Sequence, residues 1–204
     1  MKENVLSISD CVILTNFISH NSVSISKSPP MNLRNFEFKA RARDLEKLEQ
    51  KLLELNPVFK GEDHQTDTYF NVPAGRLKLR EGNIENALIY YERPDTEAAK
   101  ASDVLLYSHL PEKTLKEILV KTNGIKSVVD KIRRIYFIEN VKFHFDTVND
   151  LGTFIEVEAI DENGHRTLEE IEKQCKKYFT FFGLGESDFI SRSYCDLILE
   201  RLSE

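Results

Sequence analysis

Polar and ionic side chains recur at every second position in several short segments of this chain. Residues 35–41 read Asn-Phe-Glu-Phe-Lys-Ala-Arg, so an extended backbone places the aromatic and alanine side chains on one face and the polar ones on the other. Similar alternation occurs at 77–80, 89–93, 131–133, 143–146 and 155–158. One such strand usually has a solvated polar face, but repetition with both signs of charge indicates a site.

The order of these segments favours an α+β fold. Alternation and turn residues predict strands at 35–41, 67–71, 76–81, 87–93, 103–109, 128–138, 141–147 and 153–160. Eight antiparallel strands can close into a barrel that is wide enough for one small ligand. We therefore expect an eight-stranded antiparallel closed β-barrel whose charged faces line the bore, with helices packed outside.

Three helices are predicted from apolar spacing and capping residues. The first covers 44–56 after the N-cap Asp44, and the second covers 111–123 with Leu115, Ile118 and Leu119 facing inward. The third opens with a capping box at Thr167 and runs to residue 183. A short helix at the C-terminus completes the prediction.

The length of 204 residues suits one sizeable domain with an appendage. Residues 1–30 are rich in serine and end in Ser28-Pro29-Pro30, so we expect a disordered N-terminal extension before a domain at 32–204. A net charge of −6 argues against nucleic acid as a partner. Three cysteines at unrelated spacings and the lack of a membrane-length apolar run favour a cytoplasmic protein with no membrane partner.

Inward parity brings two sets of ionic residues together. The basic set suits several phosphoryl groups, because Arg binds phosphate oxygens bidentately and Lys acts as a point charge. The acidic set offers hard oxygen ligands that suit Mg²⁺ or Mn²⁺. The basic residues are Lys39, Arg41, Lys78, Arg80, Arg93, Lys131 and Arg133, and the acidic ones are Glu37, Asp146, Glu156 and Glu158.

Residues 35–41 resemble the Glu-x-Glu-x-Lys signature of the CYTH superfamily, the triphosphate tunnel metalloenzymes, which include class IV adenylyl cyclases and thiamine triphosphatases. The likeness continues in order through 67–70, 77–81, 131–133, 143–146, 151–158 and 193–194. The resemblance implies a tunnel that binds a triphosphate with basic residues and divalent metal with acidic ones. It also makes Arg192 a candidate substrate contact and assigns the catalytic roles to Lys39 and Arg133.

One residue departs from the signature. Asn35 stands where the first acid is expected, and its neutral carbonyl oxygen binds a cation less tightly than a carboxylate does. This change predicts weaker metal binding or the loss of one of two metal sites.

Three functions follow from these observations. The first is metal-dependent hydrolysis of inorganic triphosphate or a small organic triphosphate. The second is a class IV adenylyl cyclase that converts ATP to cyclic AMP and pyrophosphate, because the same residues would serve both reactions. The third is a protein that binds phosphorylated ligands without turnover. The expected partner is a small-molecule triphosphate, and a homodimer remains open.

Overall fold

The computed structural model describes residues 34–92, 100–161 and 164–203, so the predicted extension at 1–30 lies outside the described residues. The helices are α1 (Leu45–Leu53), α2 (Lys113–Asn123), α3 (Leu168–Phe182) and α4 (Tyr194–Ser203), with a 3₁₀ turn η2 (Glu186–Asp188). The strands are β1 (Arg34–Arg41), β2 (Val58–Phe70), β3 (Arg76–Glu81), β4 (Ala87–Glu92), β5 (Lys100–Ser108), β6 (Ile125–Ile138), β7 (Val141–Val148) and β8 (Gly152–Asp161). The predicted α+β class is confirmed.

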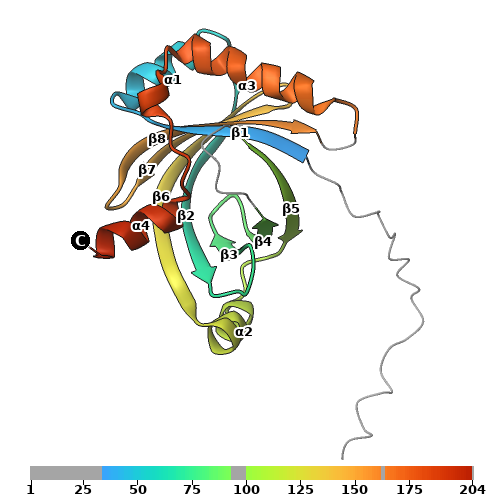
Figure 1. Ribbon diagram of the computed structural model, residues 1–204, viewed down its shortest axis with the longest axis vertical. Helices are drawn as coiled ribbons and strands as arrows, with labels where there is room; N and C mark the ends of the chain where they lie inside the picture. The colour runs from blue at the N-terminus through green and yellow to red at the C-terminus, as the bar shows by residue number, and fades with distance from the viewer. Residues whose placement is uncertain (1–33, 93–99, 162–163, 204) are drawn as a thin grey trace, which may run out of the picture. The chain divides into compact units, whose positions relative to one another are not determined.

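The strands form one antiparallel sheet in the order β1-β5-β4-β3-β2-β6-β7-β8 (Figure 1). β1 pairs with β8 along its whole length, but it pairs with β5 only where residues 34–37 oppose 100–103. Beyond this contact, the described part of β5 pairs with β4 at residues 103–108, and residues 189–190 border β1 at Lys39 and Ala40. The expected closed barrel is therefore corrected to a curled half-barrel that is joined at one end and open along the rest.

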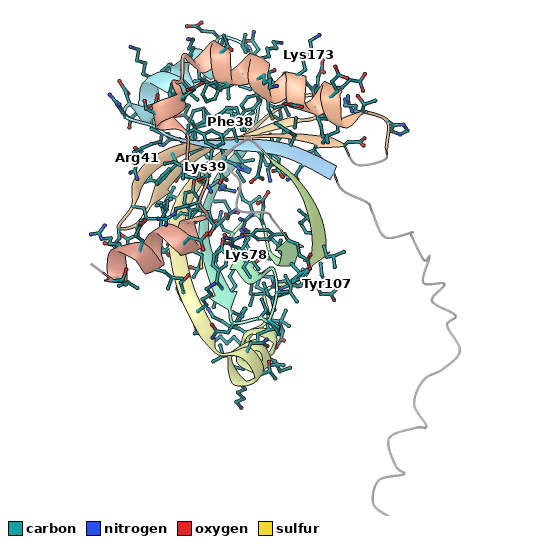
Figure 2. All side chains as sticks on the ribbon, viewed as in Figure 1. Phe38, Lys39, Arg41, Lys78, Tyr107 and Lys173 are labelled. Carbon is teal, nitrogen blue, oxygen red and sulfur yellow. The ribbon has the colours of Figure 1, made fainter. Side chains whose placement is uncertain are left out.

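β1 shows how the alternating pattern divides the two faces of the sheet. Phe38 points toward α3, whereas its neighbour Lys39 points to the concave side (Figure 2). The convex side of β1, β7 and β8 carries the main apolar core under α1 and α3. Ile171, Cys175 and Phe182 of α3 are buried there, which confirms the predicted apolar stripe and its capping box at Thr167.

The segment between α3 and α4 covers the open edge of β1. The Ile190 backbone N–H donates to the Lys39 carbonyl oxygen at 2.8 Å, and Phe189 forms an isolated β-bridge with Ala40. α4 then packs on β6, with Tyr194 and Cys195 in a second apolar cluster. This segment places Tyr194 beside the concave face of the sheet.

Two predicted elements differ from the structure. β2 begins at Val58 rather than at residue 67. The prediction missed its first half because the inward residues Asp63 and Gln65 are polar and give no apolar alternation. α2 buries none of its residues fully. Leu115 and Leu119 of the predicted inward face are half-buried, but Ile118 is 53% exposed, so the prediction is wrong for Ile118. In the part of the chain that the structure describes, no helix is long and apolar enough to cross a membrane.

Candidate functional site

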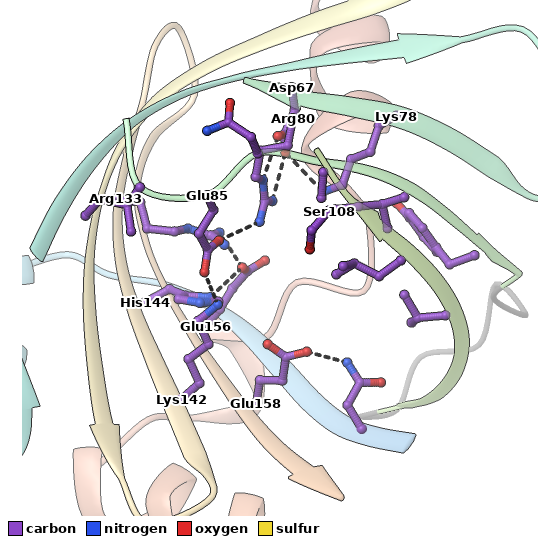
Figure 3. A pocket seen from close by; sticks show the side chains of 18 of the residues that line it. Asp67, Lys78, Arg80, Glu85, Ser108, Arg133, Lys142, His144, Glu156 and Glu158 are labelled. Carbon is purple, nitrogen blue, oxygen red and sulfur yellow. Dashed lines mark hydrogen bonds and ion pairs between the residues drawn. The ribbon is translucent and has the colours of Figure 1, made fainter. Parts of the chain in front are cut away.

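The concave face of the sheet encloses a cavity of about 630 Å³, a volume typical of small-ligand sites. All eight strands contribute to its lining. β4 and β5 supply an apolar wall, which consists of Ala87, Ile89, Tyr91, Val104 and Leu106. The other strands and the loop after β3 supply a charged wall, which contains Glu37, Lys39, Asp67, Lys78, Arg80, Glu85, Lys131, Arg133, Lys142, Glu156 and Glu158 (Figure 3).

Asp67 on β2 is the centre of a basic cluster in the charged wall. Its Oδ1 accepts a hydrogen bond from Arg80 Nε at 2.9 Å. Its Oδ2 accepts from Arg80 Nη2 and Lys78 Nζ at 3.0 Å each, and from Lys131 Nζ at 2.8 Å. Burial raises the pKa of Asp67, but the charges of Arg80, Lys131 and Lys78 outweigh burial and hold it well below its usual range. One carboxylate thus faces three cations, and the surplus positive charge suits an anionic ligand.

Lys131 is the most enclosed cation of this cluster, at 1% exposure. Burial and the charges of Arg80 and Arg133 lower the pKa of Lys131, and although Asp67 opposes them the net pKa is about 7. A bound anion would supply the negative charge that this ammonium group lacks.

Arg133 on β6 is held in one orientation by two carboxylates. Its Nε and Nη2 donate to the two oxygens of Asp146 at 2.7 and 2.5 Å, and Nη2 also donates to Glu156 Oε2 at 2.6 Å. The Tyr194 hydroxyl donates to Asp146 Oδ2 at 2.7 Å. On the other side of Glu156, Lys39 Nζ lies 2.9 Å from Oε1 and 4.1 Å from the centre of the Tyr194 ring. These bonds preorganise Arg133 and Lys39 at the cavity wall.

Glu37 and Glu158 lie directly opposite each other on β1 and β8. The Asn35 amide nitrogen donates to Glu158 Oε1 at 2.5 Å and to Glu37 Oε2 at 3.4 Å. Burial raises the pKa of Glu158; Lys142 opposes this shift, Glu37 adds to it, and the net pKa lies above its ordinary value. Asn35 is 3% exposed, and its Oδ1 has no hydrogen-bond partner among the described residues.

This oxygen-rich corner fits a divalent cation. Paired carboxylates and an unsatisfied amide oxygen are hard donors of the kind that Mg²⁺ and Mn²⁺ accept. Within residues 34–92, 100–161 and 164–203, no three His, Cys, Asp or Glu side chains already converge on one metal-binding point. A cation here would be held by Glu37 and Glu158, with further ligands from substrate or water. The Asn35 oxygen would join them only after rotation of the amide, because Nδ2 now faces both carboxylates.

His144 on β7 lies between the two kinds of charge. Its Nδ1 is 3.3 Å from Glu156 Oε2, and its Nε2 has no partner among the described residues. Burial lowers the pKa of His144 to about 3, with the charges of Arg133 and Lys142 adding to the shift. The imidazole is therefore neutral near pH 7.

Residues 33–194 match the family model of the CYTH domain. The chain belongs to the CYTH domain family. This match confirms the resemblance that the ordered motifs indicated.

Relatives of this CYTH domain are spread over distant organisms. A Methanocaldococcus jannaschii protein named "Putative adenylate cyclase" is 26% identical over 176 residues, covering 79% of this chain and 96% of that protein. A solved structure from Pyrococcus horikoshii is 28% identical, with a TM-score of 0.69 over 80% of this chain and 98% of that one. The structure of a "Putative adenylyl cyclase" from Hippeastrum, described as revealing a dominant triphosphatase activity, is 12% identical. It shares the fold, with a TM-score of 0.57 over 84% of this chain and 96% of that one.

Most of the predicted site residues of the CYTH domain line the cavity. These are Glu37, Lys39, Lys78, Arg80, Lys131, Arg133, Glu156 and Glu158. Arg134, with the opposite parity, lies on the outer side and pairs with Glu49. The period-two alternation therefore predicted correctly, for most strands, which side chains lie on the concave face.

Three predicted residues are placed differently, and a fourth is not among the described residues. Asp146 is fully buried behind Arg133 and orients that guanidinium, and its role as a metal ligand stays a prediction. Arg41 is exposed at the end of β1, where it donates to the Leu151 carbonyl oxygen at 3.1 Å. Arg192 pairs with Glu200, and only its carbonyl oxygen approaches the site, 3.4 Å from Lys39 Nζ. Arg93 lies outside the described residues.

Three residues of the charged wall were given no role from sequence. Asp67 belongs to a motif that carried the family resemblance, but a lone acid among cations has no distinctive spacing. Lys142 is two residues before His144 on β7, so its side chain lies on the same face of the strand. Extending the alternating pattern back from His144 would have predicted it. Glu85 lies in the loop between β3 and β4, where no periodicity applies.

Proposed function

We propose that this CYTH domain is a metal-dependent phosphohydrolase that acts on inorganic triphosphate or a small organic triphosphate. The observation that carries the proposal is the shared cavity, in which the basic cluster around Asp67 faces the Glu37–Glu158 carboxylate pair. A linear polyanion needs several cations in a row, and the charged wall provides them on β1, β3 and β6. The activity described for the Hippeastrum structure is consistent with this choice.

The chain's own residues divide the work between binding and charge stabilisation. Lys78 and Lys131 would hold the phosphate oxygens, since Asp67 fixes their positions, and Arg80 braces the same carboxylate. Lys39 and Arg133 would neutralise the charge that gathers on the oxygens as the bond from water to the terminal phosphorus forms and the bond to the bridging oxygen breaks. Glu37 and Glu158, with Asn35, would hold Mg²⁺ or Mn²⁺. When bound, the cation supplies charge neutralisation and alignment of the reacting groups.

The apolar wall favours a substrate with an organic group. Ile89, Tyr91 and Leu106 lie in the same cavity as the charged residues, and a bare triphosphate would leave this surface in contact with water. A nucleoside or other heterocyclic triphosphate would cover it. An organic triphosphate is therefore our preferred substrate class within the proposal.

A product-resolved assay on the full chain tests the proposal. Triphosphate, ATP and thiamine triphosphate are each offered with Mg²⁺, with Mn²⁺ or with a chelator, and orthophosphate, diphosphate and cyclic AMP are quantified separately. We expect orthophosphate release that needs the metal and falls at least about a hundredfold in Glu158→Gln, while Glu62→Gln, an exposed site on β2, keeps wild-type activity. Equal activity of wild type and Glu158→Gln would reject the assignment.

The adenylyl cyclase reaction is the second candidate, supported by the apolar wall and by the name of the Methanocaldococcus relative. In this case cyclic AMP and diphosphate would form from ATP in the same assay. If triphosphates bind tightly but no product forms at any metal concentration, the third function, ligand binding without turnover, replaces both. That outcome would identify Asn35 as the departure that removed catalysis.

A further inference from the structure

The loop between β3 and β4 is held in place by a buried carboxylate. Asp63 on β2 has no exposed surface, and its oxygens accept from the backbone N–H groups of Ile84 and Glu85 at 2.9 and 3.0 Å. Asn86 joins the two ends of the loop, since its amide accepts from the Gly82 N–H at 3.1 Å and donates to the Gly82 carbonyl at 2.9 Å. The backbone of Glu85 is therefore fixed without help from its side chain.

Gly82 is required by this arrangement. A β-carbon at position 82 would lie 2.7 and 2.8 Å from the Asp63 carboxylate oxygens and 2.8 Å from the Glu85 carbonyl oxygen. Because Gly82 has no side chain, the Asp63 carboxylate lies directly against the loop. The Glu85 side chain projects from the loop into the cavity (Figure 3). The loop thus works as a rigid support for one carboxylate.

The Glu85 carboxylate links cations from two different strands of the charged wall. Its Oε2 accepts from Arg80 Nη1 at 3.0 Å, and its Oε1 accepts from Lys142 Nζ at 2.5 Å. Burial raises the pKa of Glu85, but Lys142 and Arg80 outweigh burial and the net pKa is well below its usual value. The side chain is 26% exposed, so it is an ionised group within reach of a ligand.

A carboxylate in this position competes with phosphate. Arg80 already gives Nε and Nη2 to Asp67, so Nη1, which contacts Glu85, is the edge of the guanidinium that a phosphate oxygen would use. Lys142 on β7 also lines the cavity and contacts the same carboxylate. An additional phosphoryl group at this end would have to displace Glu85 or lie beside its negative charge.

We propose that Glu85 is a built-in anion that limits the length of the phosphate chain the cavity accepts. The inference rests on the proposed function, because it assumes that phosphoryl groups lie along the charged wall. Lys78 and Lys131 share a carboxylate that is buried behind the wall, Asp67, whereas Arg80 Nη1 and Lys142 contact one that itself lies in the cavity, Glu85. The cavity therefore discriminates against phosphate chains longer than a triphosphate.

Metal-free binding separates this role from catalysis. Dissociation constants of diphosphate, triphosphate and tetraphosphate are measured by titration calorimetry, in chelator, for the full-length wild type, Glu85→Gln and Glu62→Gln. Glutamine keeps the shape and the backbone N–H of residue 85 but removes the charge. We expect Glu85→Gln to tighten tetraphosphate binding about tenfold and diphosphate binding less than twofold. Glu62→Gln, which makes the same change of charge on the outer side of β2, should leave all three constants unchanged.

The results also separate the inference from the proposed function. If Glu85→Gln changes the dissociation constants of all three ligands by the same factor, the effect is general electrostatics. Selection by chain length is then wrong, although the proposed function stands. If wild type and variants bind none of the three in chelator, the titrations are repeated with Mg²⁺, and no binding there either overturns both. Glu85→Asp, which shortens the reach toward Lys142 and keeps the charge, provides a second variant whose gain for tetraphosphate should be intermediate. Thermal unfolding of each protein confirms that folded molecules are compared.

Discussion

The Nζ of Lys131 lies 2.8 Å from Oδ2 of Asp67, and each of the two residues is only 1% exposed. The pair sits where β2 and β6 run side by side, and Lys78 and Arg80 reach the same carboxylate from β3. The basic residues that are proposed to bind substrate are thus held by one internal counter-ion. This dependence can be tested through stability and through binding.

Asp67→Asn should lower the free energy of unfolding by about 3–5 kcal/mol, because it leaves buried cations without their shared counter-ion. Asp130→Asn is the matched control, since Asp130 lies on the neighbouring strand in an exposed pair with His64. Its loss should cost less than about 1 kcal/mol. Urea denaturation at pH 7 measures both, and equal losses would contradict the role given to Asp67.

Binding of triphosphate at pH 8 should draw a proton onto Lys131. Its pKa of about 7 in the free protein lies below the ordinary value of 10.5, so between these values the folded chain holds fewer protons than the unfolded chain. Stability from this group is therefore full above pH 10.5 and is lost as the pH falls through 7. A bound anion restores the charge and takes up about one proton.

Calorimetric titrations in two buffers of different ionisation enthalpy count that proton. Lys131→Arg keeps the charge at every working pH, so it should show only the proton exchange of the triphosphate itself. Identical uptake by wild type and Lys131→Arg would show that Lys131 is already charged before binding.

Glu158→Gln should abolish metal-dependent turnover and yet stabilise the metal-free protein at pH 7, on the order of 1 kcal/mol. The ionised form of Glu158 is disfavoured by burial and by Glu37, and the neutral amide removes that cost. Glu156→Gln, two residues away on the same strand, should destabilise instead, because Glu156 contacts Lys39 and Arg133. Thermal unfolding in chelator compares the two variants, and shifts of the same sign would refute the distinction.

Gly82→Ala should destabilise the protein by about 1–3 kcal/mol and loosen the loop that carries Glu85, since its β-carbon would meet the Asp63 carboxylate. Gly185→Ala is the control, because a β-carbon there meets its nearest neighbour at an ordinary 3.6 Å. Denaturant unfolding gives the energies. Tetraphosphate binding that tightens in Gly82→Ala alone would link the rigid loop to the exclusion of longer chains.

The alternating pattern was sufficient to predict the strands of the charged wall, because a residue such as Lys78 or Glu156 shares its face with every second neighbour. It failed where the inward residues were themselves polar, as at Asp63 and Gln65 in the first half of β2. Strand ends were a second source of error, since Arg41 has the correct parity but lies beyond the cavity.

Contacts between distant segments explain the rest. Glu85 enters the cavity because Asp63, far from it in sequence, binds its backbone, and no local pattern encodes that bond. The partial closure of the sheet likewise depends on the accumulated twist of eight strands rather than on any one strand. Family resemblance supplied the tunnel-like site, but not its internal counter-ions.

The hydrogen bond from the Tyr194 hydroxyl to Asp146 bears on the order in which the site forms as the chain is synthesised. Every strand leaves the ribosome before residues 189–194 do, yet these residues cover the edge of β1 and complete the bonds that hold Arg133. A nascent chain that has made the whole sheet therefore still lacks a finished cavity. In a chain that emerges from the ribosome, the bonds that hold Arg133 are therefore completed only after all eight strands have emerged.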